Sequence, residues 1–316
     1  MNRDNNATVV AFGEILWDLL PSGPVIGGAP FNFTYRINEL GHQGYMVSRL
    51  GTDEYGQRAQ KRVAQLQIPA DYLQTDDNHP TGTVAIELDA KQEPHYTIIP
   101  QVAYDYIEYT DTLRELVQQA DCLCFGTLAQ RNEVSRNTLR QMLDDFKGQY
   151  LLYDINLRPN TYTSKVIQQS LAHATVLKLN EEEAAEIADL CALTKTDLPD
   201  IGRALVDHYQ LIYCVITLGE RGVLALSNRD ECYYVPTFEV NLVDPLGAGD
   251  AFTAGFMHAL LWEQPLRQSC RFGNALGATV AGQAGGTQPV AGSHLKDQLR
   301  RGRSGPIDSR FNHLFR

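Results

Sequence analysis

A run of small residues beside a carboxylate, late in the chain, could bind an anion and accept a proton. Gly247, Ala248 and Gly249 precede Asp250, and a long apolar segment follows. Small residues let successive backbone N–H groups point at one spot, and a helix that begins there adds its positive end. Such an anion hole suits a transferring phosphoryl group, and Asp250 could accept the proton of an attacking hydroxyl. The alternative is a glycine-rich turn in which Asp250 only caps the helix.

A second pattern, early in the chain, could bind hydroxyl groups. Gly27 and Gly28 come just before a helical pattern, and Asn32 lies one turn inside it. The glycines would let the backbone approach a polar ligand closely, and an Asn side chain can bond a hydroxyl. Asp18 lies in an apolar, strand-like run, where a carboxylate needs partners such as two sugar hydroxyls. The alternatives are a plain helix start with Pro30 in its first turn and a solvated strand carboxylate.

The elements that must position these residues alternate between strands and helices. Apolar runs typical of strands buried on both faces occupy residues 9–13, 45–50, 122–126, 150–155, 175–179 and 211–218. Amphipathic helix patterns occupy residues 55–67, 113–120, 135–146, 181–190 and 201–209. This alternation predicts an α/β fold, with a mainly parallel central sheet covered by helices on both faces. No repeat or linker divides the chain, so we expect one domain over residues 1–316.

Two stretches, about 14–25 and 83–108, interrupt the alternation. In the second, Val84, Ile86 and Leu88 alternate with Thr, Ala and Glu, a period typical of a sheet with one wet face. We expect these stretches to form a small β lid beside the central sheet, with a surface hairpin as the alternative.

The final segment, 291–316, is basic, with six Lys or Arg residues against two Asp. We expect a short helix near 293–301 followed by a loop, either docked or partly mobile. The sequence assigns it no function.

Composition excludes several classes of protein. The formal net charge of −11 over 316 residues argues against nucleic-acid and anionic-membrane partners, because both need a basic face. No apolar run reaches the ~20 residues of a membrane helix. The polar N-terminus leads directly into a predicted strand, so we expect no signal peptide and a cytoplasmic protein. The six cysteines lie mostly in apolar runs without zinc-ligand spacing, so we expect reduced thiols.

Taken together, these patterns resemble the ribokinase family of sugar kinases, which includes fructokinase and bacterial phosphofructokinase B. The resemblance covers residues 8–290 and includes a Gly-Gly-x-x-x-Asn motif at 27–32 and a Gly-Ala-Gly-Asp motif at 247–250, in the family's order. The other matching segments are Gly51-Thr-Asp-Glu-Tyr-Gly56, Asp154-Ile-Asn-Leu-Arg158-Pro159, Asn180-Glu-Glu-Glu183 and Thr217-Leu-Gly-Glu-Arg-Gly222.

The resemblance implies an ATP-dependent kinase and gives each matching residue a role. Asp250 would be the catalytic base beside the anion hole of Gly247, Ala248 and Gly249. The residues implied to hold the sugar are Asp18, Gly27, Gly28 and Asn32. Asn180 and Glu183 would help to position Mg²⁺ and the phosphates, Glu183 indirectly, although this spacing is also that of a helix capping box. The residues implied to line the nucleotide are Thr217, Gly219 and Gly222, with Asn274 near the adenine.

The resemblance also makes potassium a candidate cofactor, because this family often binds a monovalent cation beside the anion hole. The matching ligands would be the Asp244 side chain and the backbone oxygens of Leu246, Ala281, Ala284 and Gly286. Pro245 departs from the family, which usually has Thr there. The change removes a hydroxyl and an N–H donor, which predicts weaker nucleotide contacts in this loop.

Segments 27–30, 125–131 and 154–159 look most like the fructokinase branch, which implies phosphorylation of fructose to fructose 6-phosphate. A 2-keto-3-deoxygluconate kinase is the alternative, with Arg158 facing the substrate carboxylate. In a fructokinase Arg158 would face the phosphate, or form a surface salt bridge after its strand.

An alternative from a different class is a catalytically inactive regulatory relative. Such a protein should have lost the base or the anion-hole glycines, whereas this chain keeps Asp250, Gly247 and Gly249 together with Asn180 and Glu183. The expected partners are therefore ATP and a small sugar. A homodimer formed through the β lid is a further hypothesis.

Overall fold

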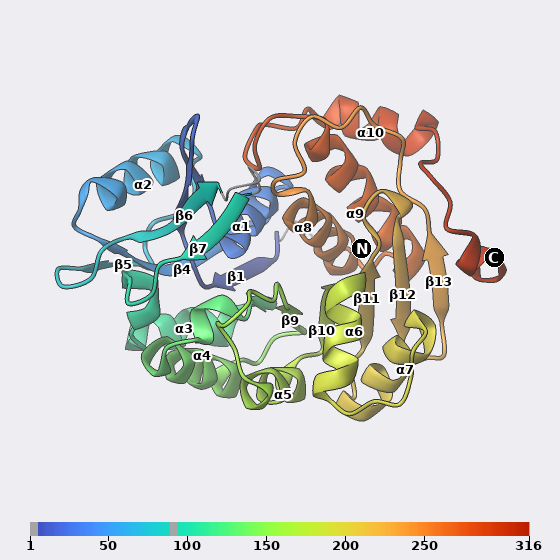
Figure 1. Cartoon of the computed structure of the whole chain (residues 1–316), viewed down its shortest axis with the longest axis horizontal. Coiled ribbons are helices and arrows are strands. Elements are labelled where there is room, and N and C mark those ends of the chain that lie inside the picture. Colours follow the sequence, from blue (N-terminus) through green and yellow to red (C-terminus); the bar gives the residue numbers. More distant parts are fainter. Residues whose placement is uncertain (1–5, 89–93, 316) are drawn as a thin grey trace.

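The computed structural model describes residues 6–88 and 94–315, and a large twisted sheet forms its centre (Figure 1). Within these residues nine strands hydrogen-bond in the order β13-β12-β11-β10-β9-β8-β1-β4-β5. The strands are β1 (Thr8–Phe12), β4 (Gln43–Gly51), β5 (Leu73–Asp76), β8 (Cys122–Phe125), β9 (Tyr150–Asp154), β10 (Val176–Asn180), β11 (Tyr213–Thr217), β12 (Val223–Ser227) and β13 (Cys232–Val235). Every pair from β11 to β5 is parallel, whereas β12 is antiparallel to both of its neighbours.

The predicted mainly parallel sheet is confirmed, with three strands that the sequence reading missed. The six predicted strands all form, and the predicted strand at 211–218 shortens to β11. The missed strands are β5, β12 and β13. β12 is buried at all five positions but follows directly on β11 through a short turn at Gly219–Arg221. Its antiparallel hairpin connection breaks the strand–helix alternation on which the prediction relied.

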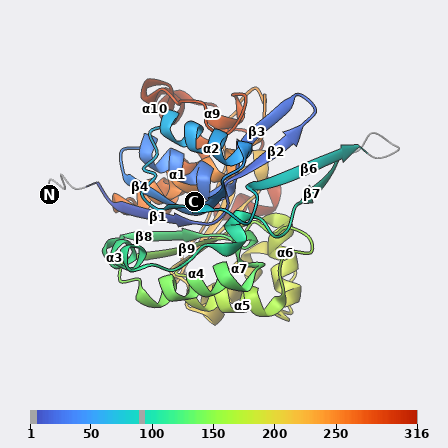
Figure 2. The ribbon, with the colours of Figure 1, turned by 90° about the vertical axis from the view of Figure 1, so that its left-hand side faces the viewer.

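Helices cover both faces of this sheet, as Figure 2 shows in side view. One face carries α3 (Asp111–Gln119), α4 (Glu133–Asp145), α5 (Ser164–His173), α6 (Glu181–Leu190) and α7 (Leu198–Tyr209). The other carries α1 (Ala29–Glu39), α2 (Glu54–Gln65), α8 (Ala248–Leu261), α9 (Leu266–Ala281) and α10 (Gly292–Arg301). Each face has its own apolar core, one including Leu139 and Ile187, the other including Phe31 and Phe256. Burial on both sides explains why the strands read as continuous apolar runs.

A second, small sheet lies beside the first and projects from the main body in Figure 2. Its strands, in the order β3-β2-β6-β7, are β2 (Leu16–Leu20), β3 (Gly23–Gly27), β6 (Gly82–Leu88) and β7 (Pro94–Ile98). It corresponds to the predicted β lid, except that residues 99–108 leave the sheet and form a loop with a 3₁₀ turn at Ala103–Tyr106. Of the predicted alternation, the side chains of Ile86 and Leu88 lie outside the described residues.

The chain closes with α10, as predicted, and with a segment of residues 302–315 that we name the C-terminal arm. The arm pairs with residues 237–239: Gly305 N–H donates to Thr237 O and Glu239 N–H donates to Arg303 O, both at 2.9 Å. Its 3₁₀ turn (Ser309–Leu314) buries Phe311 against Tyr234 on β13. The arm is therefore docked along its length, rather than a free loop.

Among residues 6–88 and 94–315, no helix combines the length and the apolar character needed to cross a bilayer.

Candidate active site

The turn that opens α8 presents free backbone donors. Gly247 has φ +76°, and a Cβ atom there would lie 2.6 Å from the Cα of Gly286, so only glycine fits. Within the described residues, the N–H groups of Gly247, Gly249 and Asp250 have no acceptor, whereas the N–H of Ala248 donates to Pro245 O at 3.1 Å. Three free donors therefore cluster at the positive end of α8, where the anion hole is predicted. The donor set differs from the prediction, since Asp250 replaces Ala248.

Asp250 lies at this turn with properties suited to a general base. Desolvation raises the pKa of its carboxyl to about 6, and the negative charge of Asp154 adds to the effect, against the lowering effect of Asn32, Lys178 and Arg158. Asn32 Nδ2 donates to Asp250 Oδ2 at 2.8 Å, which fixes the orientation of the carboxylate. A base with a pKa near neutrality takes up and releases protons efficiently at physiological pH.

A buried ion pair acts electrostatically on Asp250. This pair was not predicted from the sequence. Lys178 Nζ on β10 lies 3.0 Å from Asp154 Oδ1 at the end of β9, and both side chains are buried. Thr253 on α8 donates to the other Asp154 oxygen at 2.9 Å. Burial alone would lower the pKa of Lys178, but the charges of Asp154 and Glu183 raise it, so the lysine stays protonated. The sequence feature that could have predicted the ion pair is Lys178, a charged residue in the otherwise apolar run 175–179.

Of the residues predicted to hold a sugar, Asn32 contacts Asp250, and Gly27 lies against Asp18. Asn32 Oδ1 is buried and has no partner among the described residues, so it can accept a hydrogen bond from a ligand. A Cβ atom on Gly27 would lie 3.0 Å from Asp18 Oδ2, and one on Gly28, at φ +115°, would lie 2.4 Å from Glu14 O. Gly27 is thus required for close packing against Asp18 on β2, and Gly28 for close packing against Glu14, which precedes β2.

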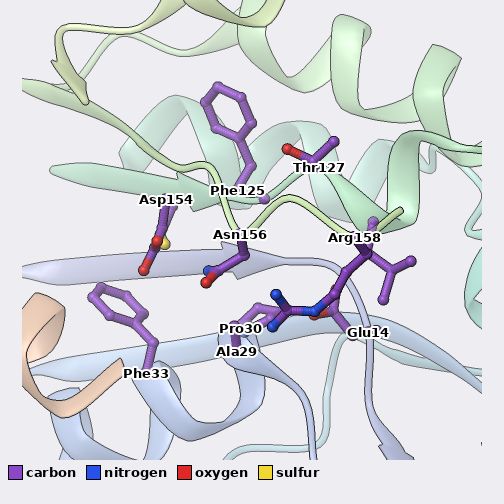
Figure 3. Close-up of a pocket in the computed structure, with 12 residues that line it drawn as sticks. Glu14, Ala29, Pro30, Phe33, Phe125, Thr127, Asp154, Asn156 and Arg158 are labelled. Carbon is purple, nitrogen blue, oxygen red and sulfur yellow. The ribbon is translucent and has the colours of Figure 1, made fainter. Parts of the chain in front are cut away.

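Next to these residues lies a small cavity of about 20 Å³, which we name the charged pocket (Figure 3). It is bounded by Glu14, Asp154, Asn156 and Arg158, with apolar walls that include Phe33 and Phe125. The volume corresponds to roughly one water molecule. Asp18, Gly27, Gly28 and Asn32 do not line it.

The charged pocket and the predicted sugar residues nevertheless share one electrostatic region. Burial raises the pKa of each of the carboxyl groups of Asp18, Glu14 and Asp250. The positive charge of Arg158 acts against this rise at all three carboxyls. A single guanidinium therefore influences both the pocket and the base.

Two residues of the charged pocket received no role from the sequence. Burial raises the pKa of Glu14 to about 7, against the lowering effect of backbone N–H groups and Arg158. Asn156 has φ +41°, an uncommon conformation for a residue other than glycine, and its buried Nδ2 has no partner in the described parts of the chain. A strained backbone and an unpaired buried donor both indicate a ligand contact. Asn156 was visible in the motif at 154–159, but nothing in the sequence showed where its side chain points.

The structure places Asn180 and Glu183 as a capping box at the start of α6. Asn180 Oδ1 accepts from Glu183 N–H and Glu183 Oε2 accepts from Asn180 N–H, both at 2.8 Å. Glu183 Oε1 also accepts from Leu157 N–H at 2.9 Å, and the side chain is buried. Glu183 therefore ties α6 to the 154–159 segment that carries Arg158. The indirect role in positioning Mg²⁺ that the resemblance implies for Glu183 stays a prediction.

A large cleft of about 840 Å³ adjoins the α8 turn. Its lining contains Thr217, Gly219, Gly222 and Asn274, the four residues predicted to lie at the nucleotide, together with Ala248 and Gly249 of the anion turn. Asn274 Nδ2 donates to Val235 O at 2.9 Å and to Pro236 O at 3.1 Å. These two bonds engage both hydrogens of its amide, so the group that Asn274 can offer to a ligand is an acceptor oxygen.

The C-terminal arm forms part of the wall of this cleft, through Ser304, Gly305 and Pro306. Ion pairs fix the arm to the motifs that precede it in the chain: Arg310 to Glu181 at 2.8 Å, and Asp308 to Arg221 at 2.6 Å. Hydrogen bonds from Arg310, followed by those from Arg221, hold the pKa of Asp308 well below its usual range. The basic segment, which had no function predicted from sequence, thus contributes to the wall of the cleft.

The five residues predicted to bind a monovalent cation lie together, but protein donors already bond several of them. The Asp244 carboxylate accepts from Leu246 N–H and Gly285 N–H, both at 2.9 Å. The Ala281 carbonyl accepts from the N–H groups of Val243 and Asp244. The Gly286 carbonyl accepts from the Arg36 guanidinium at 2.7 Å. The remaining two ligands, the carbonyls of Leu246 and Ala284, accept no hydrogen bond from residues 6–88 or 94–315.

Comparison with known proteins adds independent information. Residues 24–291 match the family model described as pfkB family carbohydrate kinase. The fructokinase of Escherichia coli is 28% identical over 275 residues, covering 81% of this chain and 85% of that protein.

Two solved structures show the same fold. One is a fructokinase double mutant from Vibrio cholerae with bound fructose, ADP and potassium ion (TM-score 0.80, 22% identity, 95% of this chain and 100% of that one). The other is a 2-dehydro-3-deoxygluconokinase from Thermotoga maritima (TM-score 0.80, 20% identity, 93% and 99%).

Proposed function

Since the chain belongs to the pfkB family of carbohydrate kinases, we propose that it transfers the γ-phosphoryl group of ATP to fructose, giving fructose 6-phosphate. The observation that carries the proposal is the position of Asp250. Its carboxylate, with a pKa of about 6, lies at a turn of free N–H donors and is bonded by Asn32. Two residues of this turn, Ala248 and Gly249, also line a cleft large enough for a nucleotide.

In the proposed reaction, the oxygen of the sugar hydroxyl forms a bond to the γ-phosphorus while the bond from that phosphorus to the ADP oxygen breaks. The hydroxyl proton passes to the Asp250 carboxylate, and ADP leaves. The N–H groups of Gly247, Gly249 and Asp250 face the negative charge on the transferring group. Mg²⁺ enters with ATP as part of the substrate, and Asn180 and Glu183 hold the adjoining backbone in place.

Asp18, Asn32 and the Gly27–Gly28 turn orient the sugar in this proposal. Asn32 offers a buried acceptor and Asp18 a carboxylate, so together they can bond adjacent hydroxyls. Arg158 neutralises the charge that the carboxylates and the incoming phosphate bring together. The residues that bind the nucleotide in the large cleft are Thr217, Gly219, Gly222 and Asn274.

Release of ADP across fructose, ribose, 2-keto-3-deoxygluconate, adenosine and fructose 6-phosphate tests the proposal. We expect the highest kcat/KM with fructose, in line with the fructokinase relatives. A higher kcat/KM with 2-keto-3-deoxygluconate would replace fructose as the substrate and leave the kinase assignment intact.

A ketodeoxygluconate kinase is the second candidate, because a neighbour of the same fold has that activity and Arg158 could pair with the carboxylate of a sugar acid. Arg158→Ala separates the two candidates. In a ketodeoxygluconate kinase the variant should lose binding of the acid most strongly. In a fructokinase it should lower turnover with little change in the KM for the sugar.

We also propose a cytoplasmic enzyme, in keeping with its need for ATP, and a homodimer that forms through the small sheet. β3 and β7 are the edge strands of this sheet, and edge strands offer unpaired backbone groups to another chain. The molar mass in solution tests the dimer, with a monomer at assay concentration as the contradicting result.

A further inference from the structure

The loop 282–290, between α9 and α10, is pressed against the active-site turn. A Cβ atom on Gly247 would lie 2.6 Å from the Cα of Gly286, and a Cβ atom on Gly286 would lie 3.3 Å from the side-chain amide of Asn32. No atom fits between these backbones. The position of Gly286 therefore determines where the free donors of the α8 turn and the Asn32 amide lie.

An ion pair on α1, between the buried Arg36 and the partly buried Glu39, holds this loop at two points. The side chain of Arg36, one turn after Asn32, has 0% exposure, and its Nη2 donates to the Gly286 carbonyl at 2.7 Å. Its Nη1 lies 2.6 Å from Glu39 Oε2. Glu39 Oε1 in turn accepts from Val290 N–H at 2.7 Å. Arg36 and Glu39 thus fix both the middle and the end of the loop to α1.

Protein donors already bond several of the predicted potassium ligands. Both oxygens of Asp244 and the carbonyl of Ala281 accept backbone N–H groups. The Gly286 carbonyl bonds a guanidinium, and a second cation on that oxygen would meet a like charge at close range. Only the carbonyls of Leu246 and Ala284 remain without a donor from the described parts of the chain.

We propose that the Arg36 guanidinium replaces the monovalent cation in this chain, so that phosphoryl transfer needs no added potassium. The inference rests on the proposed kinase function. Arg36 is a positioning residue: it touches the Gly286 backbone and holds it against Gly247 and Asn32. A guanidinium suits this role because it stays protonated, is planar, and can donate to the carbonyl and to Glu39 in fixed directions.

The first experiment uses the wild-type enzyme and measures ADP release in KCl with the sugar panel. If no sugar gives activity in KCl, the proposed kinase function is contradicted. This result is obtained before the potassium concentration is varied, so it is distinct from a failure of the potassium proposal. With the best sugar, KCl is then replaced by tetramethylammonium chloride at the same ionic strength. We expect kcat and kcat/KM to change by less than about twofold. A larger loss that added potassium restores would overturn the proposal.

A second measurement does not depend on activity. An ion that binds the native state raises the midpoint of thermal unfolding. We therefore expect equal midpoints for the wild-type protein in the two salts. A midpoint that rises with potassium concentration, at constant ionic strength, would indicate a bound ion and contradict the proposal.

Variants of Arg36 test the positioning role directly. Arg36→Met should lower kcat at least about tenfold, because a misplacement of about 1 Å near the chemistry can cost about 10²-fold. Potassium should restore part of this loss in Arg36→Met, and Arg36→Lys should keep more activity than Arg36→Met in both salts. Arg114→Met, which removes an exposed arginine on α3, is the matched control and should behave as wild type.

Wild-type kinetics in a folded Arg36→Met variant would exclude the positioning role. If Arg36→Met does not fold, Arg36→Lys and the two wild-type experiments still decide the question. A further result would also overturn the proposal. In it, Arg36→Lys and a folded Arg36→Met lose equal activity, and added potassium restores neither variant.

Discussion

The charged pocket and the large cleft are lined by different kinds of residue. The pocket side uses buried ionisable groups: Glu14, whose pKa burial raises, and the ion pair between Asp154 and Lys178. The cleft side is lined mostly by uncharged residues and glycines, and the ion pairs that fix the C-terminal arm beside it include partly exposed side chains such as Arg310 and Glu181. Charges in a dry site interact strongly, whereas exposed pairs are screened by water. Substitutions should therefore have large effects on the first side and small effects on the second.

The largest effect is expected for Asp250→Asn. The variant should fold but lose about 10²–10⁴-fold in kcat, the usual contribution of a general base. ADP release with the best sugar measures the loss, and an unchanged thermal midpoint shows that the fold is intact. Wild-type turnover in Asp250→Asn would mean that Asp250 only caps α8. The contrast between the charged pocket and the large cleft would then say nothing about catalysis.

A smaller effect is expected for Asp18→Ala and Asn32→Ala. A lost hydrogen bond to a buried ligand costs about 1–3 kcal/mol, so the KM for the sugar should rise roughly ten- to a hundredfold. The KM for ATP should stay near its wild-type value, because the large cleft contains neither residue. Equal changes in both KM values would mean that these residues support the fold rather than the sugar.

Removal of Lys178 should change the dependence of activity on pH. Asp250 acts as a base only when deprotonated, so kcat/KM should rise as pH increases through about 6. Lys178→Met deletes a charge that lowers the pKa of Asp250 and leaves Asp154, which raises it, without its partner. The acid limb of kcat/KM should therefore move to higher pH, because a base with a higher pKa is protonated over more of the acid range. An unchanged profile between about pH 5 and 9 in a folded variant would show that the pair does not act on Asp250.

The smallest effect is expected at the rim of the large cleft. Arg310 is half exposed and pairs with Glu181 and with the buried Asp308, and Asp308 keeps a second partner, Arg221, when Arg310 is replaced. Arg310→Gln should therefore raise the KM for ATP by at most about fivefold and leave the KM for the sugar unchanged. The difference from wild type should shrink in high salt, which screens exposed pairs. A hundredfold change would show that the arm matters as much as the buried charges do.

The fold was predictable from the sequence where structure follows local pattern. Strands buried on both faces appear as apolar runs, and the β lid showed its period of two. β12 and β13 were missed because a hairpin joins them to β11, a local connection with no helix to mark it. The docking of the C-terminal arm was missed because its partners, such as Glu181 and Arg221, lie far away in the chain.

The candidate site was predictable where a role belongs to a single residue. Asp250, Asn32 and Asp18 lie in motifs that can be read one at a time. Lys178 and its partner Asp154 lie 24 residues apart in the sequence, and Arg36 and its partner Gly286 lie 250 residues apart. A charged residue in an apolar run shows that a partner must exist, but only the fold shows which one.

The hydrogen bond between Asn32 and Asp250 joins positions 218 residues apart, and this has a consequence for the kinetics of folding. Contacts of such large sequence separation slow folding, because the entropy of loop closure is lost before the contact forms. During refolding from denaturant, helices can form locally while the catalytic groups still lie on unconnected stretches of chain. Recovery of kinase turnover should therefore lag behind recovery of helical circular dichroism.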